Sequence, residues 1–320
     1  MNMLRRMSLA ALVIVLALVA ASCGGGGESS DTTEGTVPPL ESTTTEAMDQ
    51  TTTTAAQETA TTQAAAFDVA AAVAEFESTI PDGWMNVGDA TAFKDAVEAS
   101  GALVIDVRQP DEYTEGHIPG AINIPLRELA ANVDKIPTDT QVFVHCKSGF
   151  RAGLAVSALR VMGYDNALSF SGSYNAWVDA GQEVSTDAVE AEVIGDPGFA
   201  PELVAAVDTY LSSIPEGWGT AGDAEAVKAA IEAGAFVLDV RSAEEYAEGH
   251  IEGAVNIPLR TIAANVDQIP TDVAVVVHCK SGFRAALSMP VLGVLGLDNA
   301  KAFTGSYDAW VEAGEPVVTG

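Results

Sequence analysis

The chain has 320 residues, of which 48% are hydrophobic, and a formal net charge of -30. This length accommodates two domains of ordinary size, and the apolar fraction is sufficient for most of the chain to fold. The strong negative charge argues against nucleic-acid binding, which usually needs a basic patch, so no nucleic-acid partner is expected. Any site for a small anion must therefore be built locally, from backbone amides and one or two cations.

Residues 1–23 have the pattern of an export signal. Arg5 and Arg6 precede the apolar run 9–21, which is too short to span a bilayer but suits the core of a signal peptide. The next residues, VAASC, resemble a bacterial lipobox, in which Cys23 is lipidated and becomes the mature N-terminus. The alternatives are an ordinary secretory signal and an uncleaved anchor. We expect an exported protein of the cell envelope, attached through lipid to the outer face of the cytoplasmic membrane.

Residues 24–66 form a second segment with its own composition. They are rich in Thr, Gly and acidic residues and contain almost no large apolar side chains. Such a segment cannot bury enough surface to offset its chain entropy. We therefore predict a disordered tether between the lipid anchor and the folded part.

The remainder of the chain is a duplication. Residues 104–139 match residues 237–272 at an offset of 133 (237 − 104 = 133), and residues 170–184 match residues 303–317. A period this long indicates a duplicated domain rather than a solenoid repeat. The predicted organisation is a first domain at 67–186, a linker at 187–195 and a second domain at 196–320.

Strand and helix patterns alternate within each copy. DATAFKDAVEAS and DAEAVKAAIEAG predict helices that begin after an N-cap, Asp89 in the first copy and Asp223 in the second. ALVIDV and QVFVHC, with AFVLDV and VAVVVHC in the second copy, are apolar runs typical of strands buried on both faces. An apolar helix that ends near a glycine follows each second strand. The alternation predicts α/β domains with mostly parallel sheets, in which ligands bind beyond the carboxyl ends of the strands.

The phrase HCKSGFRA, at residues 145–152 and again at 278–285, places a cysteine between a strand and a helix in each copy. Successive loop amides form a concave anion site there, and the helix N-terminus adds partial positive charge. The Lys and Arg of the phrase add full charges, so the surroundings favour thiolate over thiol. An inert buried cysteine is the alternative. It is disfavoured because the loop is identical in two copies whose following helices have diverged.

Two motifs in order, residues 106–125 followed by HCKSGFRA and residues 239–258 followed by HCKSGFRA, resemble the rhodanese family. The resemblance covers everything past the predicted tether. It implies two tandem α/β domains, each a five-stranded parallel sheet flanked by helices. It also implies a cysteine that takes sulfane sulfur from a donor such as thiosulfate, becomes a persulfide and passes the sulfur to an acceptor.

Carried over residue by residue, the resemblance assigns roles in both copies. Cys146 and Cys279 correspond to the persulfide-forming nucleophiles. The loop cations Arg151 and Arg284 are expected to bind an oxyanion or to brace loop carbonyls. The family often has paired glycines at SGSYNAW, where Ser173 replaces one of them. The substrate-binding loops would be Lys147, Ser148, Gly149, Phe150 and Arg151, and Lys280, Ser281, Gly282, Phe283 and Arg284. Fold and loop support would come from Asp106, Arg108, His117, Asp239, Arg241 and His250.

Loop length separates two kinds of chemistry. Phosphatases and arsenate reductases of related fold resemble Cys-x5-Arg, whereas Cys146 to Arg151 is Cys-x4-Arg, a shorter loop that suits one transferred sulfur atom. The preferred function is an exported sulfurtransferase with a small anionic sulfur donor and a thiol or protein acceptor. A docking or persulfide-carrier module is the alternative.

A thiol redox protein is disfavoured because the chain has three cysteines and no Cys-x-x-Cys. A Cys146–Cys279 disulfide would need the two sites face to face, an arrangement we do not expect. The chain also lacks a His/Cys cluster with the spacing of metal ligands, so neither a metal nor an organic cofactor is expected.

Overall fold

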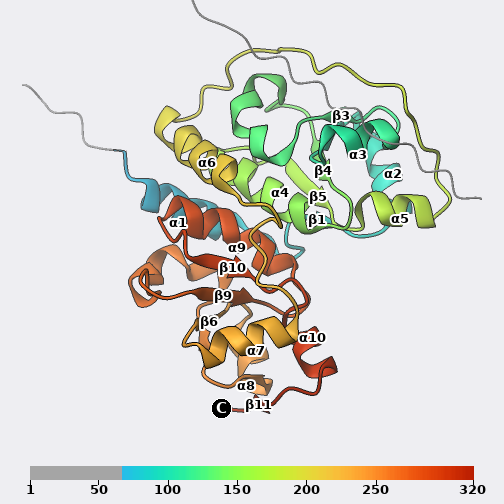
Figure 1. Ribbon diagram of the computed structural model, residues 1–320. Helices are drawn as coiled ribbons and strands as arrows, with labels where there is room; N and C mark the ends of the chain where they lie inside the picture. The colour runs from blue at the N-terminus through green and yellow to red at the C-terminus, as the bar shows by residue number, and fades with distance from the viewer. Residues whose placement is uncertain (1–66) are drawn as a thin grey trace, which may run out of the picture. The chain divides into compact units, whose positions relative to one another are not determined.

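The computed structural model describes residues 67–320, which lie within one compact unit and contain both repeats (Figure 1). The predictions for the signal segment, for Cys23 and for the tether lie outside the described residues. No helix within 67–320 combines the length and hydrophobicity that crossing a bilayer requires.

The first repeat is built on a five-stranded sheet in the order β1-β5-β4-β2-β3, and every neighbouring pair is parallel. This is the architecture that the sequence predicts. All residues of the central strand β4 are buried, as expected of a strand covered on both faces. The elements are α1 (Val69–Thr79), β1 (Asn86–Val87), α2 (Ala90–Ser100), β2 (Leu103–Asp106), α3 (Pro110–Glu115), β3 (Ile122–Asn123), the 3-10 helices η1 (Leu126–Glu128) and η2 (Ala130–Lys135), β4 (Val142–His145), α4 (Phe150–Met162), β5 (Ala167–Phe170) and α5 (Ser173–Asp179).

The second repeat has a four-stranded parallel sheet in the order β10-β9-β6-β8. Its counterpart of β1 is a single parallel bridge between Thr220 and Ala302. Gly219 and Ala221 flank Thr220 where the first copy has the better strand formers Met85 and Val87, so only the bridge forms. The elements are α6 (Pro201–Ser213), α7 (Ala224–Glu232), β6 (Phe236–Asp239), α8 (Ala243–Glu248), β7 (His250–Ile251), β8 (Val255–Asn256), η3 (Leu259–Thr261), η4 (Ala263–Gln268), β9 (Val275–His278), α9 (Phe283–Val294), β10 (Ala300–Ala302), α10 (Ser306–Glu312) and β11 (Val317–Val318), which pairs antiparallel with β7.

The helix boundaries follow from local signals in the sequence. The Asp89 carboxylate accepts hydrogen bonds from the amides of Thr91 and Ala92, and α2 ends at Gly101 in the left-handed conformation. Asp223 caps α7 in the same manner, accepting from the amide of Ala226. Both predicted N-caps are confirmed.

The helices that follow the two cysteine loops, α4 and α9, pack against each other (Figure 1). Gly153 lies against the other helix so closely that an added Cβ would come within 2.8 Å of the Ala286 Cβ. Near this crossing the Ser157 hydroxyl donates to the Leu287 carbonyl at 2.6 Å. A continuous apolar core runs through both helices. Because each loop lies at the start of its helix, this packing brings the two loops into one region.

The segments that precede the two domains cross over. The helix α1 packs on η3 and η4 of the second repeat, and α6 packs on η1 and η2 of the first as well as on α9 of its own repeat. Figure 1 shows α1, in blue, against the orange and red half. We call residues 69–85 arm 1 and residues 201–219 arm 2. The predicted boundaries at 67 and 196 assign each arm to the repeat that follows it, whereas the packing joins each arm to the other repeat as well.

Candidate active site

Each loop cysteine is held by a backbone amide at the end of a parallel strand. Cys146 directly follows β4, and the Gly149 amide donates to its Sγ at 3.1 Å. The Gly282 amide donates to the Cys279 Sγ, also at 3.1 Å. The helices α4 and α9 begin one residue later, so their first amides have no partner within the helix and point toward the loops. This arrangement stabilises negative charge on sulfur.

The loop glycines meet a strict steric requirement. Gly149 has a φ of 102°, in the left-handed region, and an added Cβ would collide with the backbone oxygen of Ser171. Gly282 has a φ of 101°, and a Cβ added there would likewise collide with the backbone oxygen of Thr304. Only glycine satisfies both the dihedral angle and the close approach. These glycines therefore fix the path by which the backbone reaches the sulfur.

Ser173, which stands where the family often has a glycine, forms the floor of the first loop. Its φ is 55°, uncommon for a residue with a side chain. The hydroxyl accepts from the Cys146 amide at 3.1 Å, donates to the Phe170 carbonyl at 2.8 Å and lies 3.7 Å from the Cys146 Sγ. Ser306 repeats these contacts around Cys279. Sequence reasoning noted the substitution but assigned no role to the hydroxyl.

The loop arginines face carboxylates and not the loop carbonyls. Arg151 donates to both oxygens of Glu112, at 2.6 and 2.8 Å, and Arg284 does the same to Glu245, at 2.5 and 2.7 Å. Burial works against the Arg151 charge, but the hydrogen bonds that Arg151 donates to Glu112 and the nearby Cys146 sulfur outweigh it and raise the pKa of Arg151. Each arginine thus braces its loop through a carboxylate and is already paired, so the geometry does not favour it as an oxyanion ligand.

The two paired glutamates were not among the predicted site residues. Glu112 lies on α3 and also accepts from the Gln109 amide, as part of a capping box. Its pKa is lowered mainly because Arg151 hydrogen-bonds to it, and the pairing with Arg284 lowers the pKa of Glu245 to about 2. A signal was available in the sequence, because a Glu stands four residues after DVR in both copies.

The residues of the first motif make hydrogen bonds within their own repeat. Arg108 donates to both oxygens of Asp106 and, at 2.7 Å, to the Gly116 carbonyl. The His117 ring stacks on Tyr113 and binds backbone carbonyls through both nitrogens. Asp239, Arg241 and His250 occupy the corresponding places in the second repeat. None of these contacts involves the sulfur atoms.

The histidines before the cysteines point away from the sulfur, as the alternation of a strand predicts. The Nε2 of His145 lies 3.6 Å from the Asp106 carboxylate, and the ring is fully buried. Burial lowers the pKa of His145, which keeps the ring neutral. His278 and Asp239 repeat the arrangement at 3.5 Å.

The two loops line one cavity of about 320 Å³. The α4–α9 packing thus brings both loops to the same space, but neither Cys146 nor Cys279 is among the lining residues. Lys147 and Lys280 do not line the cavity; both are exposed, and Lys280 pairs with Asp308 at 3.1 Å. The lining residues are Ser148, Gly149, Phe150 and Ser171 from the first repeat and Ser281, Gly282, Phe283 and Thr304 from the second.

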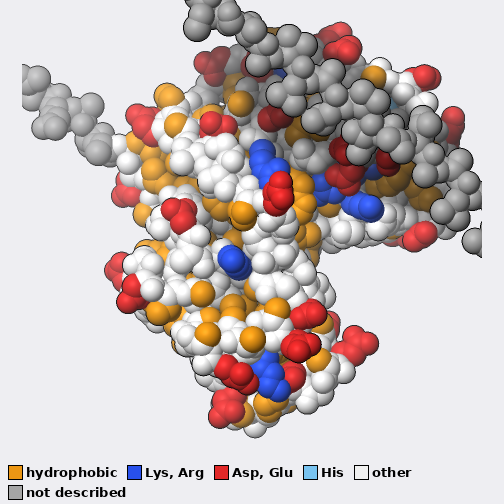
Figure 2. Space-filling model, viewed as in Figure 1, with side chains coloured by type: hydrophobic (Ala, Val, Ile, Leu, Met, Phe, Trp, Pro, Cys, Tyr) orange, Lys and Arg blue, Asp and Glu red, His pale blue; other side chains and the backbone are white. Residues whose placement is uncertain are grey.

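Cys146 and Cys279 are each only 1% exposed. The structure therefore buries both thiols in the loops that line the cavity. Outside the cavity, acidic side chains are spread over the visible face and basic side chains are sparse (Figure 2). The local positive potential of the loops therefore sits in a strongly negative surface.

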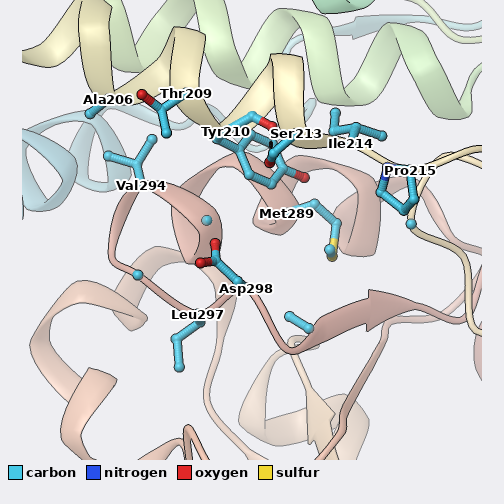
Figure 3. A pocket seen from close by; sticks show the side chains of 14 residues that line it. Ala206, Thr209, Tyr210, Ser213, Ile214, Pro215, Met289, Val294, Leu297 and Asp298 are labelled. Atoms are coloured by element: carbon cyan, nitrogen blue, oxygen red, sulfur yellow. Dashed lines mark hydrogen bonds between the residues drawn. The ribbon is translucent and has the colours of Figure 1, made fainter.

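Another cavity, of about 550 Å³, lies between α6 and the end of α9. Figure 3 shows Thr209, Tyr210 and Ser213 of α6 facing Met289, Val294 and Asp298 across it. The Tyr210 ring lies directly over Gly293, and a side chain at that position would collide with the ring. None of its lining residues belongs to the predicted site.

These features define a class of protein: parallel α/β domains that hold a cysteine in an amide-lined loop beyond a central strand. A model of the Rhodanese-like domain matches residues 89–180 and again residues 223–313. The chain belongs to the rhodanese family and carries two of its domains in tandem. Neither match includes arm 1 or arm 2.

Several relatives share part of the chain. A segment of 76 residues is 40% identical to the Uncharacterized protein YqhL of Bacillus subtilis and covers 24% of this chain and 60% of that protein, less than two thirds of its length. Another, of 79 residues, is 34% identical to a Sulfurtransferase of Allochromatium vinosum, covering 25% of this chain and 74% of the relative. Over 252 residues the chain is 25% identical to the Thiosulfate sulfurtransferase of Pseudomonas aeruginosa, and the match covers 65% of this chain and 87% of that protein. The solved structure of the 3-mercaptopyruvate sulfotransferase SseA from Escherichia coli is 22% identical in sequence and has a TM-score of 0.35. The match covers 70% of this chain and 98% of that chain.

Proposed function

We propose that this chain is an exported sulfurtransferase that moves sulfane sulfur from a small anionic donor to a thiophilic acceptor. The observation that carries the proposal is the pair of cysteines in loops that line one cavity. The sulfur of each cysteine accepts a hydrogen bond from a backbone amide, with 3.1 Å between nitrogen and sulfur. The names of two relatives, Sulfurtransferase and Thiosulfate sulfurtransferase, point to the same reaction class.

The proposed reaction is a double displacement at sulfur. With thiosulfate as donor, the Cys146 or Cys279 thiolate attacks the outer sulfur, the sulfur–sulfur bond of the donor breaks, and sulfite leaves with the bonding electron pair. The product on the protein is a persulfide anion. An acceptor thiolate then attacks the terminal sulfur and the cysteine thiolate leaves, so charge and electrons balance in both steps.

The site suits an anion although the chain is acidic. Two helix N-termini and two turns of loop amides converge on a space whose lining contains no carboxylate. Both cysteines would draw their donor from this one space.

The alternative is a docking or persulfide-carrier module without turnover. Both loops retain the cysteine and its amide donor, which favours the enzyme. A phosphatase or arsenate reductase is less favoured, because the loop is Cys-x4-Arg, shorter than Cys-x5-Arg, and because Arg151 is paired with Glu112.

The test is a thiosulfate:cyanide assay on the full chain, with Cys146→Ser, Cys279→Ser and the double variant. We expect turnover in the wild type, a mass increase of one sulfur atom for each loaded cysteine, and loss of both the turnover and the mass increase in the double variant. A wild type that forms the adduct without turnover would identify the carrier module. Aryl-phosphate hydrolysis that depends on the cysteines would replace the proposal by a phosphatase.

Export and lipid anchoring at Cys23 belong to the same proposal and rest on the sequence alone. Incorporation of labelled palmitate into the chain, and its loss in Cys23→Ser, would support the anchor. Labelling that is independent of Cys23 would exclude it.

A further inference from the structure

Each cysteine loop is bounded by a tryptophan from the other repeat. Trp218 of arm 2 lies against Arg151 of the first loop, with the guanidinium carbon 4.8 Å from the ring centroid. Trp84 of arm 1 lies against Arg284 of the second loop at 5.1 Å. The same crossed contact thus occurs twice, between residues far apart in the sequence.

The arms are fastened to the repeats that they approach. Arg127 of the first repeat donates to the carbonyls of Ile214 and Pro215 in arm 2, both at 2.9 Å, and lies 4.5 Å from the Trp218 ring. Arg260 of the second repeat does the same for arm 1. It donates to the Ile80 carbonyl at 3.1 Å and lies 4.6 Å from the Trp84 ring.

The tryptophan backbones are held in an uncommon conformation. The φ angles of Trp84 and Trp218 are 55° and 62°, in the left-handed region that bulky residues avoid. Backbone strain of this kind persists only where the surroundings fix it. Its occurrence at both equivalent positions indicates that each ring must point at the opposite loop.

The loop arginine is therefore fixed from two sides. On one side Glu112 of α3 holds Arg151 through both of its oxygens, and on the other the Trp218 ring covers the guanidinium. Arg151 is buried, and its charge acts on the Cys146 sulfur. Moving the ring would loosen the guanidinium and with it the loop that holds the sulfur.

We infer that Trp218 is a positioning residue for Cys146 and Trp84 a positioning residue for Cys279, so that each active loop is completed by the arm of the other repeat. This inference rests on the proposed sulfur chemistry only for its rate assay. It predicts that the two repeats cannot be separated without loss of both sites, although each repeat contains its own match to the Rhodanese-like domain.

The test uses full chains with a single reactive cysteine. Cys279→Ser leaves Cys146, and Cys146→Ser leaves Cys279. Trp218→Leu should slow sulfur transfer at Cys146 about tenfold or more and leave Cys279 within about twofold, since small displacements of a reacting group cost large factors in rate. Trp84→Leu should do the reverse, so each variant is the control for the other.

Two further variants separate positioning from folding. Trp218→Phe keeps an aromatic face over Arg151 and should restore most of the Cys146 rate. Arg127→Gln releases arm 2 without altering the ring and should slow Cys146 but not Cys279. Thermal melts of all variants identify any that fails to fold.

Alkylation by iodoacetamide across pH provides a readout that does not need sulfur transfer. We expect alkylation of Cys146 to be slower in Trp218→Leu than in the wild type, and alkylation of Cys279 to keep its wild-type rate. Failure of the wild type to transfer sulfur would remove the proposed function and leave this readout intact. Three results would overturn the inference. A tryptophan variant could slow the reactions at the cysteine of its own repeat, slow them equally at both cysteines, or leave the rates at both cysteines unchanged.

Discussion

Substitution of Gly149 by alanine is the most direct test of the loop geometry. An alanine there must adopt a φ of 102° and place its Cβ against the backbone oxygen of Ser171. Left-handed backbone costs an ordinary residue about 1–2 kcal/mol. Overlap with a main-chain atom, which no rotamer can relieve, adds about 1–3 kcal/mol.

The expected loss of stability is therefore about 2–5 kcal/mol, or a fall in Tm of about 4–20 °C for a folded unit of this size. Gly120 provides a matched control. Its φ is 80°, but an added Cβ meets nothing within 4 Å. Gly120→Ala should therefore cost only the conformational part, about 1–2 kcal/mol.

The assay combines thermal melts with persulfide loading in the Cys279→Ser background, measured by intact mass. Gly149→Ala should abolish loading of Cys146, because the backbone amide of residue 149, which donates a hydrogen bond to the Cys146 sulfur, must move with the loop. Gly120→Ala should load normally. If the two alanine variants were equally stable and loaded equally well, the steric reasoning about the loop would be refuted.

Three other perturbations address the brace, the cavity and the arm. Glu112→Gln removes the carboxylate that holds Arg151, and we expect slower sulfur transfer at Cys146 and a stability loss of about 1–3 kcal/mol by urea titration; an unchanged rate would show that the brace is dispensable. Thr304→Trp fills the shared cavity from the second repeat, so loading of Cys146 in the Cys279→Ser background should fall, and normal loading would mean separate donor routes. In arm 1, Glu77 is a buried residue of α1 that accepts a hydrogen bond from the Ala263 amide. Burial raises the pKa of Glu77 from 4.5 to about 7, so the folded chain holds this proton more tightly than the unfolded chain. Its contribution to stability is complete below pH 4.5 and is lost as pH rises toward 7, by at most about 3 kcal/mol. Relative to the wild type, Glu77→Gln should gain stability between pH 5 and pH 7.5, and parallel curves would contradict this account.

Much of the site is readable from the sequence because its determinants are local. A strand followed directly by Cys146, a glycine three residues later and an apolar helix place the sulfur near a backbone amide whatever surrounds them. The N-caps Asp89 and Asp223 are local in the same sense. Arg151 was predicted to act on an anion or on loop carbonyls, because nothing near it in the sequence shows that Glu112, on another helix, takes its hydrogen bonds.

The sequence by itself determined the duplicated parallel α/β domains and the two cysteine loops, since both depend on residues that are neighbours in the chain. Tertiary packing decided how those loops are used. The contact of α4 with α9 turns both loops toward one cavity, and the crossed arms bring Trp218 to Arg151 and Trp84 to Arg284. These contacts join surfaces that are distant in sequence, and the choice of partner depends on how two whole domains fit together.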